Sequence, residues 1–352
     1  MRRESPLRVA VILLLTTNPY QRLLHAALEE HAVSTLPGRP TPWWVWRRRA
    51  QYDVIHLHWI EFLLNRRGGT VVSVAALVSV VSSLALARLH GKRIIWTVHN
   101  ATPHDPTYPL LQRLLFVLVA RLSHALVVHT DATASVVRSR LPAGERTVVI
   151  RHGNYLGAYP PATGDRAETR ARHGLRDDDL VLLAFGQVRP YKQLLRTARA
   201  LAEIDDERVR LVVVGGPTDP AEAQRLRDLA ARDPRIVLDL RHVADDEVEA
   251  LHAMSDAAVI PYAGDFASGA LLLGLGFGLP VLAPVRSSAS EVVAADALID
   301  FSGTNLAAAL DDLRGRPAEQ MRAAALASAE RVPWAASARQ HAEAYRGAPR
   351  QR

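Results

Sequence analysis

Two cations stand three residues apart just after a short apolar segment in the second half of the chain. The segment from Leu182 to Lys192 reads LLAFGQVRPYK and carries Gly186, Arg189 and Lys192. A glycine lets a ligand approach the backbone closely, an arginine can hold a phosphate through two parallel hydrogen bonds, and a lysine adds a point charge. The spacing therefore predicts a loop that binds a diphosphate, with a pair of solvated basic residues after a strand as the alternative.

A second phosphate-binding pattern lies further along the chain. Ser268 and Gly269 precede an apolar helical stretch that begins near Ala270. The first turn of a helix presents unpaired backbone N–H groups and the positive end of the helix dipole, and both favour phosphate. Ordinary N-capping by Ser268 is the alternative. Because both patterns follow strands that we expect in one parallel sheet, together they predict a single site.

Short apolar segments that alternate with longer helical patterns must position these loops. Such alternation predicts parallel sheets with helices on both faces. The expected strands of the first half are Val9–Leu15, Val54–Leu57, Arg93–Val98, Ala125–His129 and Thr147–Ile150. Those of the second half are Leu180–Phe185, Val209–Val214, Ile236–Leu238, Ala257–Ile260, Pro280–Ala283 and Ala297–Ile299. Two such series predict an α/β protein of two doubly wound, Rossmann-like domains with a ligand cleft between them.

The boundary between the two domains is expected in a segment rich in proline and glycine. Residues 157–165 read GAYPPATGD, which suits a linker. We therefore assign an N-terminal domain to residues 1–160 and a C-terminal domain to residues 161–331. Residues 332–352 contain a helical pattern, which predicts a terminal helix that can return to the first domain.

In their order along the chain, these motifs resemble the donor half of GT-B glycosyltransferases. The sequence runs G-x-V-R-P-Y-K, then V-V-G-G, then the Ser-Gly helix start, then G-x-P-V. The first half agrees through the segments Asp53–Trp59, Trp96–Asn100 and Arg151–Asn154. The resemblance covers nearly the whole chain and is to the branch related to glycogen synthase and the lipid-linked oligosaccharide mannosyltransferases, of the family 4 type.

The resemblance implies how the C-terminal domain would bind a nucleotide-sugar donor. Arg189 and Lys192, with the backbone at Gly186, would hold the donor diphosphate and stabilise the leaving nucleotide. The backbone at Ser268 and Gly269 would bind the same phosphates. The first domain would then bind the acceptor.

Three further residues of the C-terminal domain follow from the resemblance. Val243 would border the nucleotide base, and Glu291 would lie on a loop that faces the donor. Many retaining relatives carry two acidic residues eight positions apart near the Ser-Gly helix start; Asp265 fits the first, but Leu273 stands at the second. The sequence therefore leaves open whether the configuration of the sugar is retained or inverted.

An inverting transfer needs a general base next to the acceptor hydroxyl. The loop after the expected strand 93–98 offers His99, His104 and Asp105. Parallel α/β domains place ligands at such strand ends, and either an imidazole or a carboxylate can take the proton. All three residues are therefore candidates, with a structural hydrogen bond as the alternative for any single histidine.

His56, His58 and Glu61 stand at another strand end and are further candidates to meet the acceptor. A metal site built from them is conceivable, but their spacing is not that of a zinc motif. The implied fold uses an arginine, a lysine and a helix N-terminus in place of a metal, so we expect no metal cofactor. His129 and His152 are weaker candidates.

Positive charge is concentrated in the first half of the chain. Residues 1–160 hold 19 Lys and Arg against 8 Asp and Glu, whereas the whole chain has 43 against 36 and a formal net charge of +7. A basic domain suits an anionic partner such as phospholipid head groups or a lipid diphosphate, with solvated surfaces as the alternative. The chain has no cysteine, which fits a reducing compartment. We expect a cytoplasmic protein that can associate peripherally with the inner face of the cell membrane.

Two apolar segments resemble membrane signals. Val71–Ala87 carries no charge and is just under the length of a membrane-spanning helix. It contains four serines and is followed by a charged turn and a strand, so we expect a buried helix of the first domain. Val9–Leu15 fits a buried first strand better than a signal peptide, because no small-x-small cleavage pattern follows it.

These observations predict a hexosyltransferase that moves a sugar from GDP-mannose or a UDP-sugar to a lipid-linked or other glycan acceptor. A nucleotide-sugar epimerase of the same fold would share the phosphate site but need no acceptor. A non-catalytic nucleotide-sugar-binding protein would lose no activity on replacement of Arg189 or Lys192. A dinucleotide oxidoreductase is disfavoured because TTNP, and not G-x-G-x-x-G, follows the first strand. No nucleic-acid-binding motif accompanies the positive charge, so we expect no nucleic-acid partner.

Overall fold

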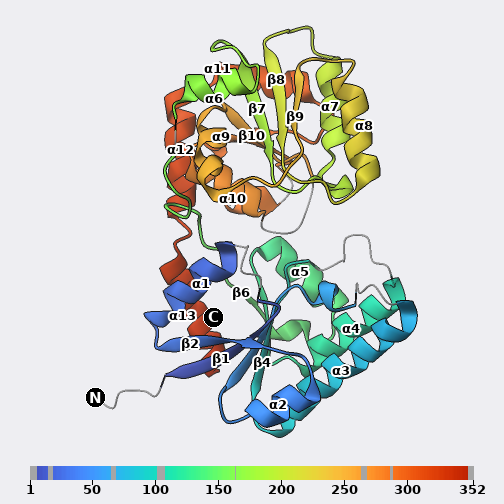
Figure 1. Cartoon of the computed structure of the whole chain (residues 1–352). Helices are drawn as coiled ribbons and strands as arrows, with labels where there is room; N and C mark the ends of the chain where they lie inside the picture. Colours follow the sequence, from blue (N-terminus) through green and yellow to red (C-terminus); the bar gives the residue numbers. More distant parts are fainter. Residues whose placement is uncertain are drawn as a thin grey trace. The chain divides into compact units, whose positions relative to one another are not determined.

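The computed structural model describes residues 6–14, 19–64, 69–100, 108–162, 164–262, 268–285 and 288–347. The chain forms two compact units (Figure 1). The N-terminal unit comprises residues 1–153 and 332–352, and the C-terminal unit comprises residues 154–331. The candidate residues His104, Asp105 and Asp265 lie outside the described residues.

The N-terminal unit is built on a sheet of six parallel strands in the order β2-β1-β3-β4-β5-β6. The strands are β1 (Leu7–Ile12), β2 (Val33–Gly38), β3 (Val54–Leu57), β4 (Arg93–Thr97), β5 (Ala125–Val128) and β6 (Thr147–Val149). The helices are α1 (Pro19–Glu29), α2 (Pro42–Arg48), α3 (Gly69–Leu89), α4 (Pro109–Leu122), α5 (Asp131–Arg140) and α13 (Trp334–Arg346). The sheet order reverses between β1 and β3.

The edge strand β2 is the one strand of this sheet that the sequence patterns do not predict. Its sequence, VSTLPG, has no continuous apolar run, and Pro37 lacks the N–H group that a central strand would need. An edge strand tolerates both features because one side of its backbone has no strand to pair with. The central strands β3 and β5, by contrast, are buried throughout and read as apolar runs.

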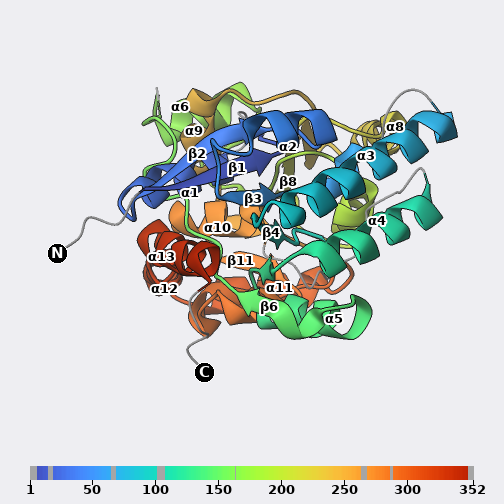
Figure 2. The same ribbon diagram turned by 90° about the horizontal axis from the view of Figure 1, so that it is seen from below.

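The C-terminal helix α13 is part of the core of the N-terminal unit. Ala338, Ala342 and Tyr345 are buried in one cluster with Tyr20 and Leu24 of α1. Figure 2 shows α13 beside this unit's sheet, and its contacts with α1 and β4 agree. The final segment of the chain therefore completes a domain that the first 153 residues begin.

Helix α3 is not the fully buried helix that its composition predicts. It packs against α2, α4 and β4, yet Val71, Val74 and Val78 along one side stay exposed. Apolar residues surround the whole circumference of the helix. One side packs in the core, and the apolar residues of another side therefore remain exposed to solvent. By length and composition α3 could also cross a membrane, a criterion that core helices of other proteins meet as well.

The C-terminal unit has a second sheet of six parallel strands, in the order β12-β11-β10-β7-β8-β9. The strands are β7 (Leu180–Phe185), β8 (Val209–Val214), β9 (Ile236–Asp239), β10 (Ala257–Val259), β11 (Val281–Ala283) and β12 (Leu298–Asp300). The helices are α6 (Arg166–Arg172), α7 (Leu194–Ala202), α8 (Pro220–Ala230), α9 (Val248–Ala253), α10 (Gly269–Gly276), α11 (Leu306–Gly315) and α12 (Ala318–Glu330). The two doubly wound α/β sheets that the sequence predicts are confirmed.

The strand order of the C-terminal unit places its switch point between β7 and β10. From β7 the chain builds outward through β8 and β9, then returns to the other side of β7 and continues through β10, β11 and β12. This is the nucleotide-binding order of doubly wound folds, in which ligands sit beyond the carboxyl ends of the two central strands. Separate apolar clusters fill the two faces of the sheet.

Candidate active site

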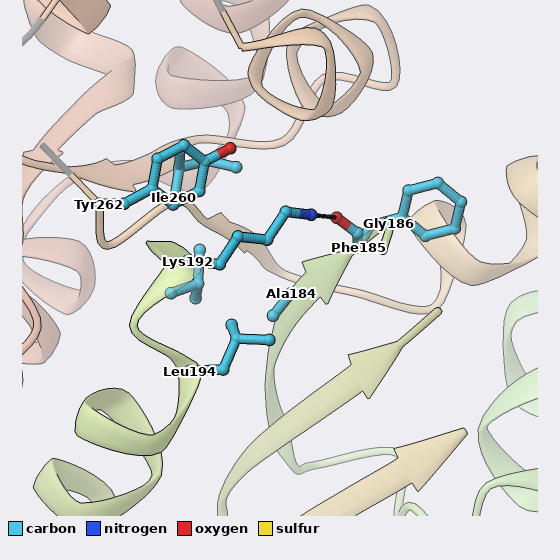
Figure 3. A pocket seen from close by; sticks show the side chains of 8 residues that line it. Ala184, Phe185, Gly186, Lys192, Leu194, Ile260 and Tyr262 are labelled. Atoms are coloured by element: carbon cyan, nitrogen blue, oxygen red, sulfur yellow. Dashed lines mark hydrogen bonds between the residues drawn. The ribbon is translucent and has the colours of Figure 1, made fainter. Parts of the chain in front are cut away.

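A pocket lies at the switch point of the C-terminal sheet, beyond the carboxyl ends of β7 and β10 (Figure 3). The residues that line it are Ala184, Phe185, Gly186, Lys192, Leu194, Val259, Ile260 and Tyr262. The structure thus brings Gly186 and Lys192, both predicted from the sequence, to one side of a cavity whose other side comes from β10. The site is small and is formed entirely by residues of the C-terminal unit.

Two glycines at the ends of β7 and β8 allow the backbones of these neighbouring strands to approach each other closely beside the pocket. Gly186, after β7, has φ +94°, and Gly215, after β8, has φ +145°, a backbone conformation that side chains rarely adopt. A Cβ atom on Gly215 would overlap the carbonyl group of Gly186. A Cβ atom on Gly186 would stand 3.2 Å from the Lys192 Nζ atom. The positive φ at both positions and the backbone overlap at Gly215 therefore favour glycine there.

Lys192 is a buried cation at the base of the pocket. It ends the 3-10 helix η3 (Pro190–Lys192), is 8% exposed, and its Nζ atom donates to the Phe185 carbonyl at 3.2 Å (Figure 3). Within the described part of the chain this is its one hydrogen-bond acceptor. Burial, with the nearby charge of Arg189, lowers the pKa of Lys192 from 10.5 to about 8. A buried ammonium group with spare N–H donors is costly without an anion beside it.

Arg189 has an unsatisfied donor of the same kind. Its Nη2 atom donates to Gln187 Oε1 at 2.7 Å, which orients the guanidinium group. Its Nε atom is buried and has no hydrogen-bond partner among the described residues. Buried N–H groups are normally paired, so an unpaired one beside a buried lysine indicates a missing acceptor. A phosphate group would supply it.

The N-terminus of α10 joins the pocket through Tyr262. The Tyr262 hydroxyl lies 2.7 Å from Ser268 Oγ, which also accepts from the Leu271 backbone N–H at 3.4 Å as the N-cap of the helix. Next to it, a Cβ atom on Gly269 would stand 3.2 Å from the Tyr155 hydroxyl. The two phosphate-binding patterns of the sequence are therefore connected through Tyr262, which sequence reasoning did not select.

The remaining described candidates for the donor site, Val243 and Glu291, follow the strands β9 and β11 of the C-terminal sheet. Val243 is partly buried and packs with Phe185 in the apolar cluster beneath the loop. The loop before it begins at Arg241, which forms ion pairs with Asp239 and Glu247. Glu291 ends the 3-10 helix η5 (Ser288–Glu291) that follows β11. Val243 therefore packs against the core of the C-terminal unit, and its place beside the nucleotide base stays a prediction.

In the N-terminal unit, four adjacent strands each lead into a histidine. His58 follows β3, His99 follows β4, His129 follows β5 and His152 follows β6. The ring of Tyr20, from α1, lies within 6 Å of all four, with centroid distances of 5.8, 5.2, 5.5 and 4.8 Å respectively. This tyrosine–histidine cluster, defined by these five residues, marks the carboxyl edge of the sheet where parallel folds bind ligands.

His99 is held by contacts with two neighbouring rings. Its Nε2 atom lies 3.0 Å from His58 Nδ1, and its ring stacks on Trp59 with centroids 4.2 Å apart and planes at 10°. Trp59 has φ +40° and ψ +46°, a left-handed conformation that is unfavourable for a bulky side chain. Such strain persists where the surrounding structure enforces it, and it is commonest at functional sites.

Burial keeps the cluster neutral. It lowers the pKa of His129 to about 4 and that of His152 to about 3, and it lowers the pKa of His58 and His99 well below 6.5. His129 Nδ1–H donates to the Ile150 carbonyl and His152 Nδ1–H to the Gly153 carbonyl, so both rings have a fixed tautomer. At neutral pH these imidazoles are hydrogen-bonding groups and weak proton acceptors.

Glu61 provides a buried carboxylate that contacts Asn100, the residue after His99. It lies in the 3-10 helix η1 (Ile60–Leu63), is 9% exposed, and its Oε1 atom accepts from Asn100 Nδ2 at 2.8 Å. His56, in contrast, lies within β3 and points to the core, where its two ring nitrogens contact Thr97 Oγ1 and the Tyr345 hydroxyl, each at 2.8 Å. His56 is therefore structural, and Glu61 is the better placed of the two for chemistry. No group of three or more acidic or histidine side chains within the described ranges could hold a metal ion.

Sequence comparison places this chain among known enzymes. A model of the family described as "Glycosyl transferases group 1" matches residues 179–314. A GDP-mannose:glycolipid 4-beta-D-mannosyltransferase of Xanthomonas campestris pv. campestris is 30% identical over 313 residues, which cover 86% of this chain and 81% of that protein. The chain belongs to the group 1 glycosyltransferases.

A further relative and two solved structures resemble this group 1 glycosyltransferase. A D-inositol 3-phosphate glycosyltransferase of Streptomyces scabiei is 29% identical over 201 residues, covering 54% of this chain and 42% of that protein. HepE of Anabaena, solved with UDP-glucose, has a TM-score of 0.73 at 16% identity and covers 97% of this chain and 99% of its own. Sucrose-phosphate synthase of Thermosynechococcus elongatus has a TM-score of 0.71 at 17% identity, with 97% and 98% covered. The fold is GT-B.

This glycosyltransferase has two candidate sites, and the residues that match the family model include only one of them. The pocket with Gly186, Lys192 and Tyr262 falls within residues 179–314, whereas the tyrosine–histidine cluster falls outside. Sequence reasoning missed Tyr262 and Tyr20. Tyr262 lies three residues after β10, as Gly186 lies just after β7, so a search of the residues that follow each predicted strand could have found it.

Proposed function

We propose that this enzyme transfers mannose from GDP-mannose to a lipid-linked glycan acceptor. The membership of group 1 supports glycosyl transfer, and the 30%-identical relative is named for this donor and for a glycolipid acceptor. The C-terminal unit binds the donor, and the N-terminal unit binds the acceptor at the carboxyl edge of its sheet. The enzyme acts as a peripheral protein at the inner face of the cell membrane.

The observation that carries the proposal is the set of unsatisfied cationic donors at the switch point. Lys192 Nζ and Arg189 Nε are buried N–H groups with too few acceptors among the described residues. A diphosphate between them and the N-terminus of α10 supplies those acceptors and spreads its charge over two cations and a helix dipole. The same groups stabilise the charge that develops on the leaving GDP, which is why we propose a metal-independent reaction.

The chemistry assigned to the N-terminal unit is deprotonation of the acceptor. The acceptor hydroxyl oxygen bonds to the anomeric carbon of mannose, the bond from that carbon to the diphosphate oxygen breaks, and the hydroxyl proton passes to a base. Glu61, a carboxylate oriented by Asn100, is suited to take the proton. His99, with its lowered pKa, is suited to orient the hydroxyl by a hydrogen bond. His104 and Asp105 remain candidates from the sequence.

Thermal stabilisation by nucleotides tests the donor assignment. The full chain is melted with GDP, UDP, ADP, dTDP, UMP and NAD, because a ligand that binds only the folded state raises the melting temperature. GDP is expected to give the largest shift, and Arg189→Gln is expected to abolish it, while Arg199→Gln on the exposed side of α7 serves as the matched control. No shift with any diphosphate, or a shift with NAD alone, would overturn the assignment. A product formed from GDP-mannose without acceptor would indicate an epimerase.

A further inference from the structure

Three consecutive helices of the N-terminal unit expose a set of large apolar side chains. Figures 1 and 2 show α2, α3 and α4 side by side, and α3 contacts both of the others. Trp43 is 64% exposed, Val71 81% and Leu110 82%. We define the apolar face as eight of the exposed apolar residues of these helices, leaving out Leu89 at the C-terminal end of α3: Trp43, Trp46, Val71, Val72, Val74, Val78, Leu110 and Leu114.

These side chains are not the scattered apolar residues of an ordinary surface. Val71, Val74 and Val78 recur at helical spacing along α3, and Leu110 and Leu114 do the same on α4. A helix that covers a sheet normally turns polar residues outward at these positions. Contiguous exposed apolar surface is uncommon on monomeric proteins and marks a site of contact.

The charges on the same helices identify the partner as anionic. Helices α2, α3 and α4 contain no Asp or Glu, and they carry five arginines: Arg47, Arg48, Arg88, Arg113 and Arg121. Arginine and tryptophan also pair at this surface, because the Arg47 guanidinium lies 5.8 Å from the centre of the Trp43 ring. Arg49, the next residue after α2, lies 5.1 Å from the centre of the Trp46 ring. Apolar side chains flanked by tryptophan and arginine match the interface of an anionic bilayer.

The position of this face relates it to the acceptor site. Helices α3 and α4 begin after the strands β3 and β4, and the same strand ends lead into His58 and His99. Their exposed N-terminal turns, with Val71 and Leu110, therefore belong to the edge of the sheet that carries the tyrosine–histidine cluster. A bilayer that contacts these turns presents the head group of a lipid-linked acceptor at that edge.

We propose that the apolar face docks on the surface of an anionic lipid bilayer. The valines and leucines of α3 and α4 enter the boundary between head groups and acyl chains, and Trp43 and Trp46 anchor α2 at head-group level. The arginines contact lipid phosphates. Helix α3 therefore lies along the membrane surface while it remains packed on the sheet. The link to the acceptor rests on the proposed function, whereas the docking itself does not.

Vesicle flotation of the full chain tests the docking. The protein is mixed with vesicles of phosphatidylcholine alone or with added phosphatidylglycerol, at low and at high salt. Binding is expected to require the anionic lipid and to weaken with salt. The double variant Trp43→Ala/Trp46→Ala is expected to lose binding at least tenfold, and Arg47→Gln about fivefold, since one surface arginine contributes about 1 kcal/mol. Val71→Ser/Val74→Ser is a second apolar variant, in case the tryptophan variant fails to fold.

Matched controls come from the C-terminal unit. Val285, 43% exposed, is replaced by serine, and the exposed Arg232 by glutamine; neither change should alter binding. Wild-type protein that stays unbound on anionic vesicles, or controls that weaken binding as much as the test variants, would overturn the proposal. A dimer in solution that the tryptophan variant dissociates, with no vesicle binding, would instead assign the face to a second copy.

Transfer assays keep this test separate from that of the proposed function. With a short-chain acceptor free in solution, the tryptophan variant is expected to transfer mannose as the wild type does, and with a vesicle-embedded acceptor it should fall with its vesicle binding. Wild-type binding to vesicles without any transfer from GDP-mannose would leave the docking intact and refute the proposed function. Equal transfer by both proteins to the embedded acceptor would refute the link between docking and acceptor.

Discussion

The His58 Nδ1 atom lies 3.0 Å from the His99 Nε2 atom, so one imidazole donates a proton to the hydrogen bond and the other accepts it. The two residues follow adjacent strands, β3 and β4, and come together because the strands pair in register from Val54 with Arg93 to Leu57 with Trp96. Trp59 stacks on the ring of His99, so this ring is held in one orientation. His58 is therefore a positioning residue for His99.

Loss of this contact is expected to slow transfer more than it weakens donor binding. His58→Leu removes a hydrogen bond worth roughly 1 kcal/mol, so we expect kcat to fall about fivefold or more with the KM for GDP-mannose unchanged. In His58→Asn the side-chain amide can replace Nδ1, and activity should partly return. Steady-state kinetics on both variants, with thermal unfolding as the check on folding, measure this. Equal activities for the two variants would contradict the positioning role.

Donor binding is expected to take up a proton at mildly alkaline pH. The pKa of Lys192 is lowered to about 8 in the free enzyme, and an adjacent diphosphate favours the charged form and raises it again. At pH 8.5 to 9 the free lysine is largely neutral, so binding of GDP must protonate it. Calorimetry in buffers of different ionisation enthalpy measures the proton uptake. Lys192→Met should eliminate it, and uptake that persists in this variant would place the titrating group elsewhere.

The buried charge of Lys192 is expected to lower the free energy of unfolding of the ligand-free enzyme at neutral pH. The folded pKa of about 8 is lower than the unfolded value of 10.5, so between these values the unfolded chain binds more protons. The contribution of Lys192 to the free energy of unfolding therefore rises as the pH rises from 8 to 10.5. At pH 7 Lys192→Met should raise the melting temperature of the ligand-free protein, as measured by calorimetry, while it removes stabilisation by GDP. A lowered melting temperature would argue against a costly buried charge.

The N-terminal unit is expected to lose stability in mild acid. Burial lowers the pKa of His25 and His129 to about 4 and that of His152 and His341 to about 3. Each histidine binds protons only in the unfolded chain between its folded pKa and 6.5, so the free energy of unfolding falls as the pH drops through this window, by at most about 1.4 kcal/mol per pH unit for each. Denaturant unfolding from pH 7 to pH 4 measures the slope. His341→Gln should reduce it, and an unchanged slope would contradict the assignment.

The attachment of α13 to the N-terminal unit is expected to depend on Tyr345. Its hydroxyl contacts the buried His56 at 2.8 Å, and its ring is 1% exposed. Tyr345→Phe should destabilise this unit by roughly 1 kcal/mol through the lost hydrogen bond, and Tyr345→Ala by about 3–5 kcal/mol through the added cavity. Urea unfolding monitored in the full chain measures both. Similar values for the two variants would show that packing of the ring contributes little.

The sequence predicts the donor loop well because its signal is local. Gly186, Arg189 and Lys192 lie within seven consecutive residues after a single strand. They therefore come close together whatever the order of the strands in the sheet. The tyrosine–histidine cluster depends instead on which strands are neighbours. The order β2-β1-β3-β4-β5-β6 decides that, and apolar runs do not reveal it. Tyr20 joins from a helix whose packing is equally non-local.

The outer side of α3 could not be predicted for a different reason. The composition shows that the segment is apolar, but it does not show which helices and strands of the fold pack against it. In the structure α2, α4 and β4 cover one side, and Val71 and Val78 are left exposed. Hydropathy alone therefore suggested a core helix where the structure has a helix with one side in the core and another on the surface.

The central claim, that the buried Lys192 and the neighbouring Arg189 of the C-terminal unit bind the diphosphate of a mannose donor, is tested most directly by a transfer assay. The 352-residue chain is incubated with GDP-mannose and a lipid-linked glycan, and mass spectrometry follows the addition of one hexose to the acceptor. We expect transfer by the wild type and by Arg199→Gln, and loss of transfer by ten- to a hundredfold in Arg189→Gln and Lys192→Met, as removal of charge-assisted hydrogen bonds implies. Wild-type activity in both cation variants would contradict the account.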